Sequence, residues 1–175
     1  MRAGKVRSFL HGAVLTALPL YRLTAQDHST MDHAAHAAVP AATNDSAFRA
    51  LQQRGKGTMG VDQYASRHRF EDLPDGGRIE LQMREADSAG VAQIRAHLRQ
   101  TAEEFRRGQF TAPEATHAMI VPGTAVMAAS RDRIRYTVRE LPQGGEIRIT
   151  TRDAEALAAV REFLAFQRSD HRTDP

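Results

Sequence analysis

Two stretches of the chain alternate between hydrophobic and polar residues with a period of two. The first covers positions 78–83, where Ile79, Leu81 and Met83 alternate with polar residues. The second covers positions 133–138 and has the same pattern. A period of two with one polar side predicts strands of an antiparallel sheet that exposes one face to solvent.

After each predicted pair of strands the hydrophobic period changes to that of a helix. Asp87 and Asp153 precede these helical stretches, and aspartate is a favoured N-cap residue. The residues that fall on one side of each predicted helix are Val91, Ile94, Leu98, Ala102 and Phe105 in the first and Leu157, Val160 and Leu164 in the second. Each helix is therefore expected to bury one apolar stripe.

The two strand–helix segments are copies of each other. The sequence LPDGGRIEL at 73–81 matches LPQGGEIRI at 141–149, with an offset of 68 residues at the turns and 66 at the helices. The copies span 61–107 and 130–168. Within each turn, proline presets φ, and the two glycines are expected to supply positive φ for a bulged hairpin.

These patterns predict an α+β fold in which two tandem ββα repeats form an antiparallel sheet with helices packed on one face. The segment 116–129 between the copies contains a short apolar run interrupted by Pro122 and Gly123. It is expected to add one or two strands.

The N-terminus has the pattern of a secretory signal peptide over residues 1–25. Three basic residues precede an apolar stretch at 9–20, and Ala25 is a small residue at the predicted cleavage position. The prediction is a protein exported to the periplasm or secreted. An amphipathic N-terminal helix of a cytoplasmic protein remains the alternative.

Residues 26–47 are rich in Ala, His and small polar groups and contain little that could be buried, so they are expected to form a flexible tail. A single domain is expected over 48–175. It would begin with a short helix that Ser46 caps and that ends near Arg54, before the glycines at 55, 57 and 60.

Composition excludes several classes of function. The formal net charge is +3, but without residues 1–25 the chain carries 20 basic and 21 acidic side chains. Nucleic acid is therefore not an expected partner, because no basic surface remains. The absence of cysteine excludes thiol nucleophiles and Cys-ligated zinc or iron–sulfur sites. No apolar run is long enough for a membrane span.

One glycine motif at 55–60 has the form G-x-G-x-x-G. A dinucleotide site needs a strand before this loop and a helix after it, whereas the pattern here predicts the reverse order. We therefore interpret these glycines as a hinge.

The predicted tail contains a cluster of potential metal ligands. Thioether favours Cu(I), and imidazole binds Cu(II), Zn(II) or Ni(II). Cleavage after Ala25 would also place a histidine third in the mature chain, where a free amine, two amides and an imidazole can form a square-planar nitrogen set. The candidate ligands are Gln26, His28, Met31, His33 and His36. The segment resembles the His/Met-rich tails of periplasmic copper-handling proteins, which implies copper as the ligand.

Four further histidines lie in the predicted domain and are weaker metal candidates: His68, His97, His117 and His171. The repeat aligns His68 with Tyr136 and His97 with Phe163, so a packing role is the simpler interpretation. A metal or ligand pocket is the alternative.

Four blocks of sequence resemble a family of small exported bacterial proteins of unknown function. They are LPDGGRIELQ, DSAGVAQIRAHL, VPGTAVMAA and EFLAFQRSDH, and the similarity spans residues 48–172. That family is associated with the label aspartate carbamoyltransferase. The residues do not support this activity, because the Ser-Thr-Arg-Thr phosphate-binding signature is missing and the chain is about half the length of that enzyme.

Three functions remain open. The leading hypothesis is an exported, non-enzymatic protein whose tail binds copper or a similar ion. The second is a small-molecule-binding module with its pocket between the sheet and the helices. The third is an enzyme that uses His68 or His97 as acid or base. The sequence leaves the oligomeric state open.

Overall fold

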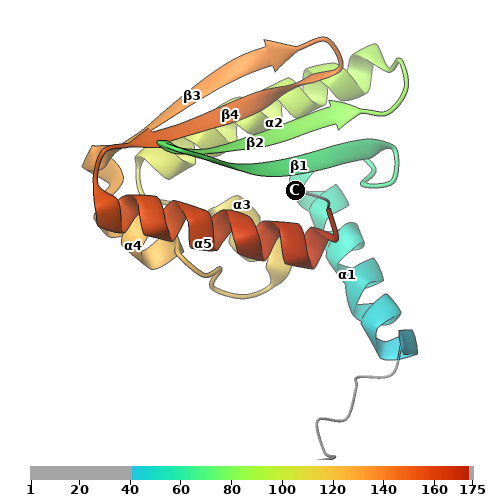
Figure 1. The fold of residues 1–175 in the computed structure, drawn as a ribbon. Helices are drawn as coiled ribbons and strands as arrows, with labels where there is room; N and C mark the ends of the chain where they lie inside the picture. Colours follow the sequence, from blue (N-terminus) through green and yellow to red (C-terminus); the bar gives the residue numbers. More distant parts are fainter. Residues whose placement is uncertain (1–40, 174–175) are drawn as a thin grey trace, which may run out of the picture. The chain divides into compact units, whose positions relative to one another are not determined.

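The computed structural model describes residues 41–173, which belong to one compact unit, Val39–Pro175. Strands and helices alternate in the order that the repeat predicts (Figure 1). The elements are α1 (Ala41–Met59), β1 (Ser66–Leu73), β2 (Gly76–Met83), α2 (Ser88–Arg106), α3 (Thr111–His117), α4 (Thr124–Ala129), a 3₁₀ turn (Arg131–Arg133), β3 (Ile134–Leu141), β4 (Gly144–Thr151) and α5 (Ala154–His171). The α+β class and the two ββα units are confirmed.

The four strands form one antiparallel sheet in the order β1-β2-β4-β3. The two hairpins are joined through β2 and β4, where Ile79 lies opposite Ile147. This register is two-fold symmetric: the pair Gly77–Ile149 is the repeat equivalent of the pair Gly145–Leu81. The two copies are therefore related in space as well as in sequence.

Each hairpin closes with a two-residue turn and without a bulge, since Leu73 pairs with Gly76 and Leu141 with Gly144. Of the four glycines at these turns, only Gly76 has a positive φ, of 149°. The expectation that both glycine pairs supply positive φ is therefore wrong. The structure indicates that these glycines are needed instead for close packing between the two copies.

The helices cross over to the opposite copy. Helix α2 lies mainly on β3 and β4, and α5 lies mainly on β1 and β2. A Cβ at Gly77 would overlap the Leu164 side chain on α5, and a Cβ at Gly145 would lie 3.0 Å from Leu98 Cδ1 on α2. The second glycine of each pair thus lets the helix of the other copy approach the sheet, so neither copy buries its apolar surfaces alone.

Both long helices begin as the sequence predicts. The Asp87 carboxylate accepts a hydrogen bond from Gly90 N, and the Asp153 carboxylate accepts one from Ala156 N. The predicted stripe of α2 is buried throughout. On α5 the buried stripe is shifted by about one residue, because Leu157 is only half-buried whereas Ala156 and Phe163 are buried.

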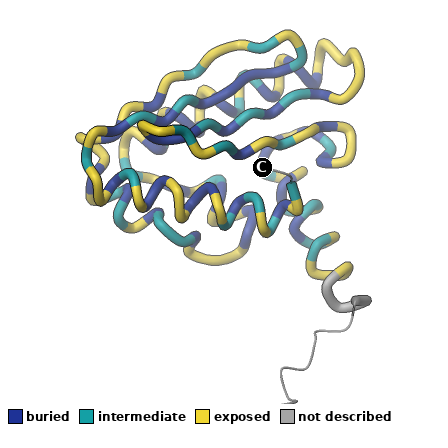
Figure 2. Tube along the Cα trace, in the orientation of Figure 1, coloured by how far each residue is buried: buried dark blue, intermediate teal, exposed yellow. Residues whose placement is uncertain are grey.

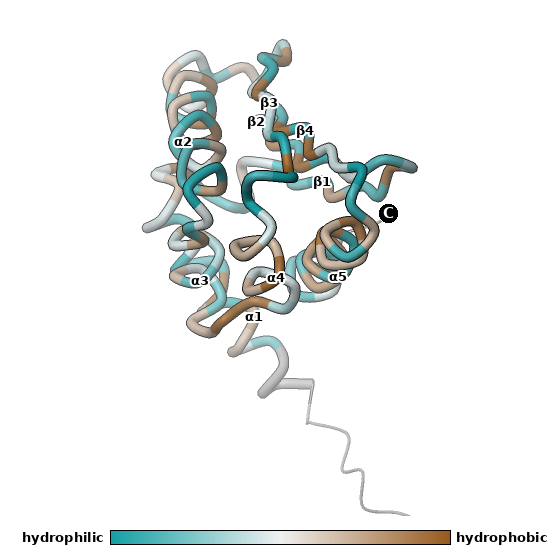
Figure 3. The backbone as a smooth tube through the Cα atoms, turned by 90° about the vertical axis from the view of Figure 1, so that its left-hand side faces the viewer, coloured by the Kyte–Doolittle hydropathy of each residue, from teal (hydrophilic) through white to brown (hydrophobic). Residues whose placement is uncertain are grey.

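The inward face of the sheet and the helices enclose one hydrophobic core. Figure 2 shows the central strands β2 and β4 buried over much of their length, while the edge strands alternate with exposed positions. Figure 3 shows α3 and α4 between α2 and α5. In the part of the chain that the structure describes, no helix has the length and apolarity to cross a membrane.

The segment 116–129 differs from its prediction. It forms the end of α3 and the whole of α4 instead of strands. A short apolar run does not distinguish a strand from a helix. Ile120 is 76% exposed and Met119 is 49% exposed, so the run does not supply the buried face of a strand. Gly123, with φ of 81°, begins α4 close to Ala159 O of α5, where a side chain would not fit.

Helix α1 is longer than predicted at both ends. It begins at Ala41, so residues 41–47, expected in the tail, are helical, and Ser46 lies inside the helix. Gly55 and Gly57 lie in its last turns, and only Gly60 follows its end, with φ of 77°. Packing overrides the low helix propensity of glycine here: Leu51 and Met59 are buried, and Arg54 Nε donates to Thr116 O on α3.

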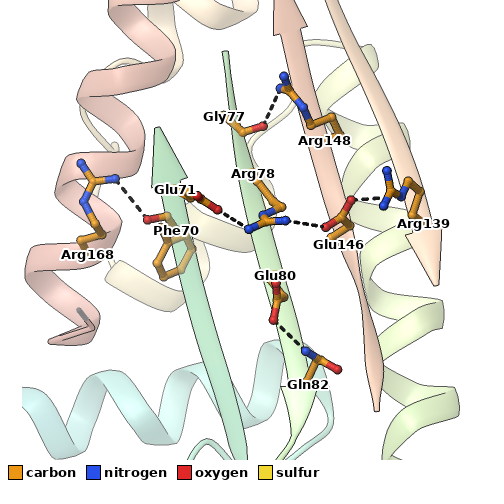
Figure 4. A network of polar contacts seen from close by, with 10 residues as sticks. All are labelled: Phe70, Glu71, Gly77, Arg78, Glu80, Gln82, Arg139, Glu146, Arg148 and Arg168. Atoms are coloured by element: carbon orange, nitrogen blue, oxygen red, sulfur yellow. Dashed lines mark hydrogen bonds and ion pairs between the residues drawn. The ribbon is translucent and has the colours of Figure 1, made fainter. Parts of the chain in front are cut away.

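The outward face of the sheet carries a row of alternating charges across all four strands (Figure 4). Arg78 on β2 pairs with Glu71 on β1, and its Nη1 lies 3.5 Å from Glu146 Oε2 on β4. Arg139 Nε on β3 lies 3.2 Å from Glu146 Oε1. The repeat relates Glu71 to Arg139 and Arg78 to Glu146, so the two copies carry opposite charges at equivalent positions.

Candidate functional site

All four histidines of the domain converge on one pocket between the sheet and the helices. His68 comes from β1, His97 from α2, His117 from α3 and His171 from α5. The pocket has a volume of about 70 Å³. We call it the histidine pocket; Met59, Thr101, Phe105, Phe163 and Gln167 are among its other lining residues.

Local structure directs each imidazole inward. His68 alternates with outward-facing residues on β1 and shares its face with buried Phe70. His97 precedes buried Leu98 on α2. His117 is the last residue of α3, which ends because Ala118 adopts the left-handed conformation with φ of 55°. His171 is the last residue of α5, where Arg172 has φ of 53°.

Three of the rings contact one another. The centroids of His68 and His171 lie 4.8 Å apart in a stacked arrangement. The centroids of His117 and His171 lie 5.1 Å apart, with the rings nearly perpendicular. Phe70 stacks on the other side of His68 at 5.8 Å. The histidines therefore form a continuous cluster.

The polar atoms of the pocket are incompletely satisfied by protein groups. His117 Nδ1 lies 2.5 Å from Asp170 Oδ2, and its Nε2 lies 3.1 Å from Gln167 Oε1. Gln167 is 4% exposed, and its Nε2 has no hydrogen-bond partner among the described residues. The His171 ring nitrogens form no hydrogen bond to a described residue, but they are not among the fully buried unpartnered atoms. A buried polar group without a partner destabilises a protein by roughly 1–3 kcal/mol, so Gln167 Nε2 is the atom that favours a bound molecule or water in the pocket.

Burial keeps the imidazoles uncharged. Desolvation, followed by the nearby histidines His97 and His117, lowers the pKa of His68 to about 4. Desolvation, followed by His68 and His117, lowers the pKa of His171 to about 3 against the opposing effect of Asp170. Desolvation also lowers the pKa of His97. At neutral pH these three rings are neutral and can both donate and accept hydrogen bonds.

The residues that line the pocket, all of them in the described part of the chain, include no Asp, Glu, Lys or Arg. Within the same part of the chain, no group of three or more His, Cys, Asp or Glu side chains is arranged to hold a metal ion. The pocket therefore suits a ligand that does not need a formal countercharge.

The two-fold symmetry shows what occupies the equivalent positions at the other end of the sheet. His68 corresponds to Tyr136 and His97 to Phe163, as the sequence indicates. The 66-residue offset of the helices also pairs His171 with Phe105. Phe105 lies 5.5 Å from Tyr136 and 6.0 Å from Phe163 between ring centroids. We call these three residues the aromatic cluster.

Sequence analysis missed two polar or soft members of the pocket. Met59 Sδ lies 3.3 Å from His68 Nε2, and Gln167 contacts His117. Met59 belongs to α1, outside the repeat, so no alignment of the copies marks it. Gln167 aligns with Thr101, whose Oγ1 lies 3.4 Å from His97 Nε2. The repeat alignment therefore places a polar residue at both of these equivalent helix positions, and this could have marked Gln167 from the sequence.

The five tail candidates, Gln26, His28, Met31, His33 and His36, lie outside the described residues. So does the predicted signal peptide. Their metal binding and cleavage stay predictions. The glycine motif at 55–60 follows no strand and lies mostly inside α1, so it does not form a nucleotide-binding loop.

Comparison of the chain with protein-family models, with curated proteins and with solved structures finds no match.

Proposed function

We propose that this protein is a non-enzymatic binding module that holds a small uncharged or weakly charged ligand in the histidine pocket. The observation that carries the proposal is the convergence of His68, His97, His117 and His171 from four different elements on one cavity. Gln167 Nε2 and the ring nitrogens of His171 supply hydrogen-bonding atoms that no described protein group uses.

Binding is supported better than acid–base catalysis. An efficient catalytic base has a pKa near the working pH. The pKa of His68 is lowered to about 4 and that of His97 is also lowered, which makes both rings weak bases at neutral pH. Neutral imidazoles instead provide directional contacts to a bound molecule.

The test replaces pocket histidines with the residues found at the equivalent positions of the aromatic cluster. A triple variant with His68→Tyr, His97→Phe and His171→Phe, which we call the sister-residue variant, places in the pocket the side chains found at the equivalent positions. Because these side chains pack between the repeat-equivalent strand and helices in the aromatic cluster, we expect the variant to fold. Tyr136→Phe, which alters one polar atom of the aromatic cluster, is the matched control.

Native and denaturing mass spectrometry of the full chain, purified without added ligand, would measure the small molecule or ion that it retains. We expect a mass difference for the wild type and for Tyr136→Phe, and none for the sister-residue variant. An identical retained mass in all three proteins, or none in the wild type, contradicts the proposal.

We propose a second function, metal binding by an exported tail, on the evidence of the sequence pattern alone. Three imidazoles and one thioether occur between residues 28 and 36, and this ligand set favours copper. A full-length variant with His28→Ala, Met31→Leu, His33→Ala and His36→Ala should lose copper that the sister-residue variant keeps. Export itself is tested by the N-terminal mass of the mature protein, which should begin at Gln26.

A further inference from the structure

Strand β3 forms one edge of the sheet (Figure 1). The pair Leu141–Gly144 flanks the two-residue turn and is hydrogen-bonded, and such pairs alternate along an antiparallel ladder. The backbone groups of Tyr136 and Val138 therefore point away from β4. Arg106 on α2 agrees with this direction, since its Nη2 donates to Tyr136 O at 2.7 Å.

The two edges of the sheet differ at equivalent carbonyl groups. On β1, Arg168 Nη1 of α5 donates to Phe70 O at 3.2 Å. The repeat equivalent of Phe70 is Val138. The equivalent of Arg168 is Ala102, which carries no side-chain donor. Within the part of the chain that the structure describes, no side chain bonds to the backbone of Val138. The β3 edge therefore keeps backbone groups with which an added strand can pair.

A groove of about 950 Å³ lies along the first half of β3 and the end of β4. Its charged lining residues are Arg106, Arg133, Arg135, Arg152, Asp75 and Asp132. Asp75 pairs with Arg148. Arg131 Nε lies 3.9 Å from Asp132 Oδ1. Of the four lining arginines, Arg135 and Arg152 are exposed and have no carboxylate partner among the described residues. These two give the groove an uncompensated positive charge.

The other copy keeps the same arginines around a smaller groove of about 330 Å³. The repeat aligns Arg135 with Arg67, Arg152 with Arg84 and Arg106 with Arg172. Helix α1 borders this smaller groove. The Arg172 guanidinium lies 4.3 Å from the Phe48 ring centroid, and its Nη1 lies 3.5 Å from Asp45 Oδ1, both on α1. A carboxylate of the chain thus already contacts the arginine equivalent to Arg106. None of the described residues that line the groove at β3 belongs to α1, α3, α4 or α5, so no such helix covers it.

Charge distinguishes the strands that are able to pair with β3. Antiparallel pairing with β3 of a second copy, centred on Thr137, would place Arg135 opposite Arg139. Pairing with β1 of a second copy would bring the exposed Arg67 and Arg69 to the same edge. Like charges on facing strands are destabilising, whereas arginine and carboxylate form strong, often bidentate pairs. The partner that fits is an extended segment with carboxylates at alternate positions.

We propose that the β3 edge is a docking site for an extended acidic peptide. The peptide adds a strand to the sheet through the backbone of Tyr136 and Val138, and its carboxylates pair with Arg135 and Arg152. The site is separate from the histidine pocket, and it does not depend on the function proposed for that pocket.

The test titrates the full ¹⁵N-labelled chain with a capped peptide of alternating glutamate and valine. Amide hydrogen exchange at Tyr136 and Val138 should slow about tenfold in the complex, because strand pairing removes these donors from solvent. Exchange at Phe70, on the opposite edge, should stay unchanged. The fully N-methylated peptide has the same charges and no backbone donors, so it should bind about tenfold more weakly.

Two kinds of variant separate the charges from the strand edge. Arg135→Glu combined with Arg152→Glu should weaken peptide binding about tenfold. Arg67→Glu combined with Arg84→Glu, the same change at the equivalent positions of the other copy, should alter it by less than about twofold. Val138→Pro removes an edge donor without removing a hydrogen bond to β4, and it should abolish the slower exchange at Tyr136.

The proposal is overturned if the peptide does not bind, if the N-methylated peptide binds equally well, or if both pairs of arginine variants lose the same affinity. Unchanged exchange at Val138 with bound peptide also contradicts it. Sulfated dextran tests the alternative ligand, an anionic polysaccharide. If it binds more tightly than the peptide and depends on Arg135 and Arg152, the groove belongs to that ligand and the peptide site is rejected.

Discussion

The histidine pocket and the aromatic cluster hold repeat-equivalent residues of one pseudo-symmetric fold and adjoin each other, because Phe105 and Phe163 of the cluster also line the pocket. At one end Phe105, Tyr136 and Phe163 are 1%, 2% and 2% exposed and contact one another through their rings. At the other end the equivalent pair, His171 and His68, also contact through their rings, but these rings are stacked, whereas those of Phe105 and Tyr136 meet edge to face. The strand pairing and the helix crossings are equivalent at both ends, whereas α1 and α3, which lie outside the repeat, contribute residues to the histidine pocket.

The difference between the two ends separates packing from chemistry. The aromatic cluster shows that this architecture needs only large flat side chains at the three positions. Histidine is a poorer choice for packing, because its ring is polar and burial lowers the pKa of His68 to about 4 and of His171 to about 3. Each end also holds one buried polar atom without a partner among the described residues, Gln167 Nε2 in the histidine pocket and Tyr136 OH in the aromatic cluster. The histidines are therefore better explained by a ligand than by the stability of the core.

The outward face of the sheet contains a second contrast between the copies. Glu71 and Arg78 of the first copy face Arg139 and Glu146 of the second with opposite signs. Across the β2–β4 pair, Arg78 and Glu146 are diagonal neighbours, while the directly opposite residues carry like charges, Arg78 facing Arg148 and Glu80 facing Glu146. The inversion therefore supplies an attractive diagonal contact between the two copies.

Exchanging single residues between the two clusters tests directly whether they have different packing requirements. Phe105→His should destabilise the protein by about 3 kcal/mol, because it removes ring contacts from the core and buries a polar ring. His171→Phe, at the equivalent position, should change the free energy of unfolding by less than about 1 kcal/mol. Urea denaturation at pH 7 measures both. Equal losses would show that the two ends are under the same packing constraint.

A pH series tests the neutral state of the imidazoles. Burial lowers the pKa of His68 to about 4 and that of His171 to about 3 in the folded protein, below the ordinary histidine value of 6.5. The unfolded chain therefore binds more protons below pH 6.5, so the free energy of unfolding falls as the pH decreases toward 4. Between pH 6 and 5 the two histidines together should remove roughly 2 kcal/mol of stability.

The sister-residue variant is the control for this series, because it lacks these titrating groups. Its stability should change far less between pH 6 and 5. Below pH 4 both proteins should lose stability together, since Asp62, Asp75 and Asp153, which accept hydrogen bonds that lower the pKa of each carboxyl, are present in both. Parallel curves over the whole range would contradict neutral, buried imidazoles in the wild type.

The smallest expected effect concerns the charge row. Arg78→Glu combined with Glu146→Arg places like charges side by side in both hairpins and should destabilise the protein by about 1 kcal/mol at low ionic strength. Adding Glu71→Arg and Arg139→Glu restores alternating signs and should recover most of the loss. Thermal unfolding of the two variants at low and high salt measures this. No recovery in the fourfold variant would mean that the row has no part in strand pairing.

Much of the fold could be predicted because it depends on local patterns. The period of two predicted β2 and β3, the change to a helical period predicted α2 and α5, and Asp87 and Asp153 cap these helices as expected. The repeat itself predicted that the two halves are alike. The prediction was wrong at 116–129, where the apolar run contained no clear period, and it was short for α1, where tertiary contacts hold Gly55 and Gly57 in a helix.

The site was only half predictable. The sequence marked His68 and His97 as replacements for aromatic residues, and the same offset would have added His171 opposite Phe105. Nothing local indicated that His117, at the end of an unpredicted helix, would lie against His171, or that Met59 would reach His68. Such contacts depend on how whole elements pack, which period and propensity do not describe.

The sequence by itself determined the two ββα units, because strand and helix periods, turn residues and caps act within a few residues of one another. Only the tertiary structure decided that each helix crosses to the hairpin of the other copy, since Gly77 and Gly145 admit Leu164 and Leu98. That crossing brings the end of α5 beside β1, so the ring of His171 comes to lie 4.8 Å from that of His68. The pocket forms because residues far apart in the chain lie on one buried face. Their spacing along the sequence does not predict this proximity.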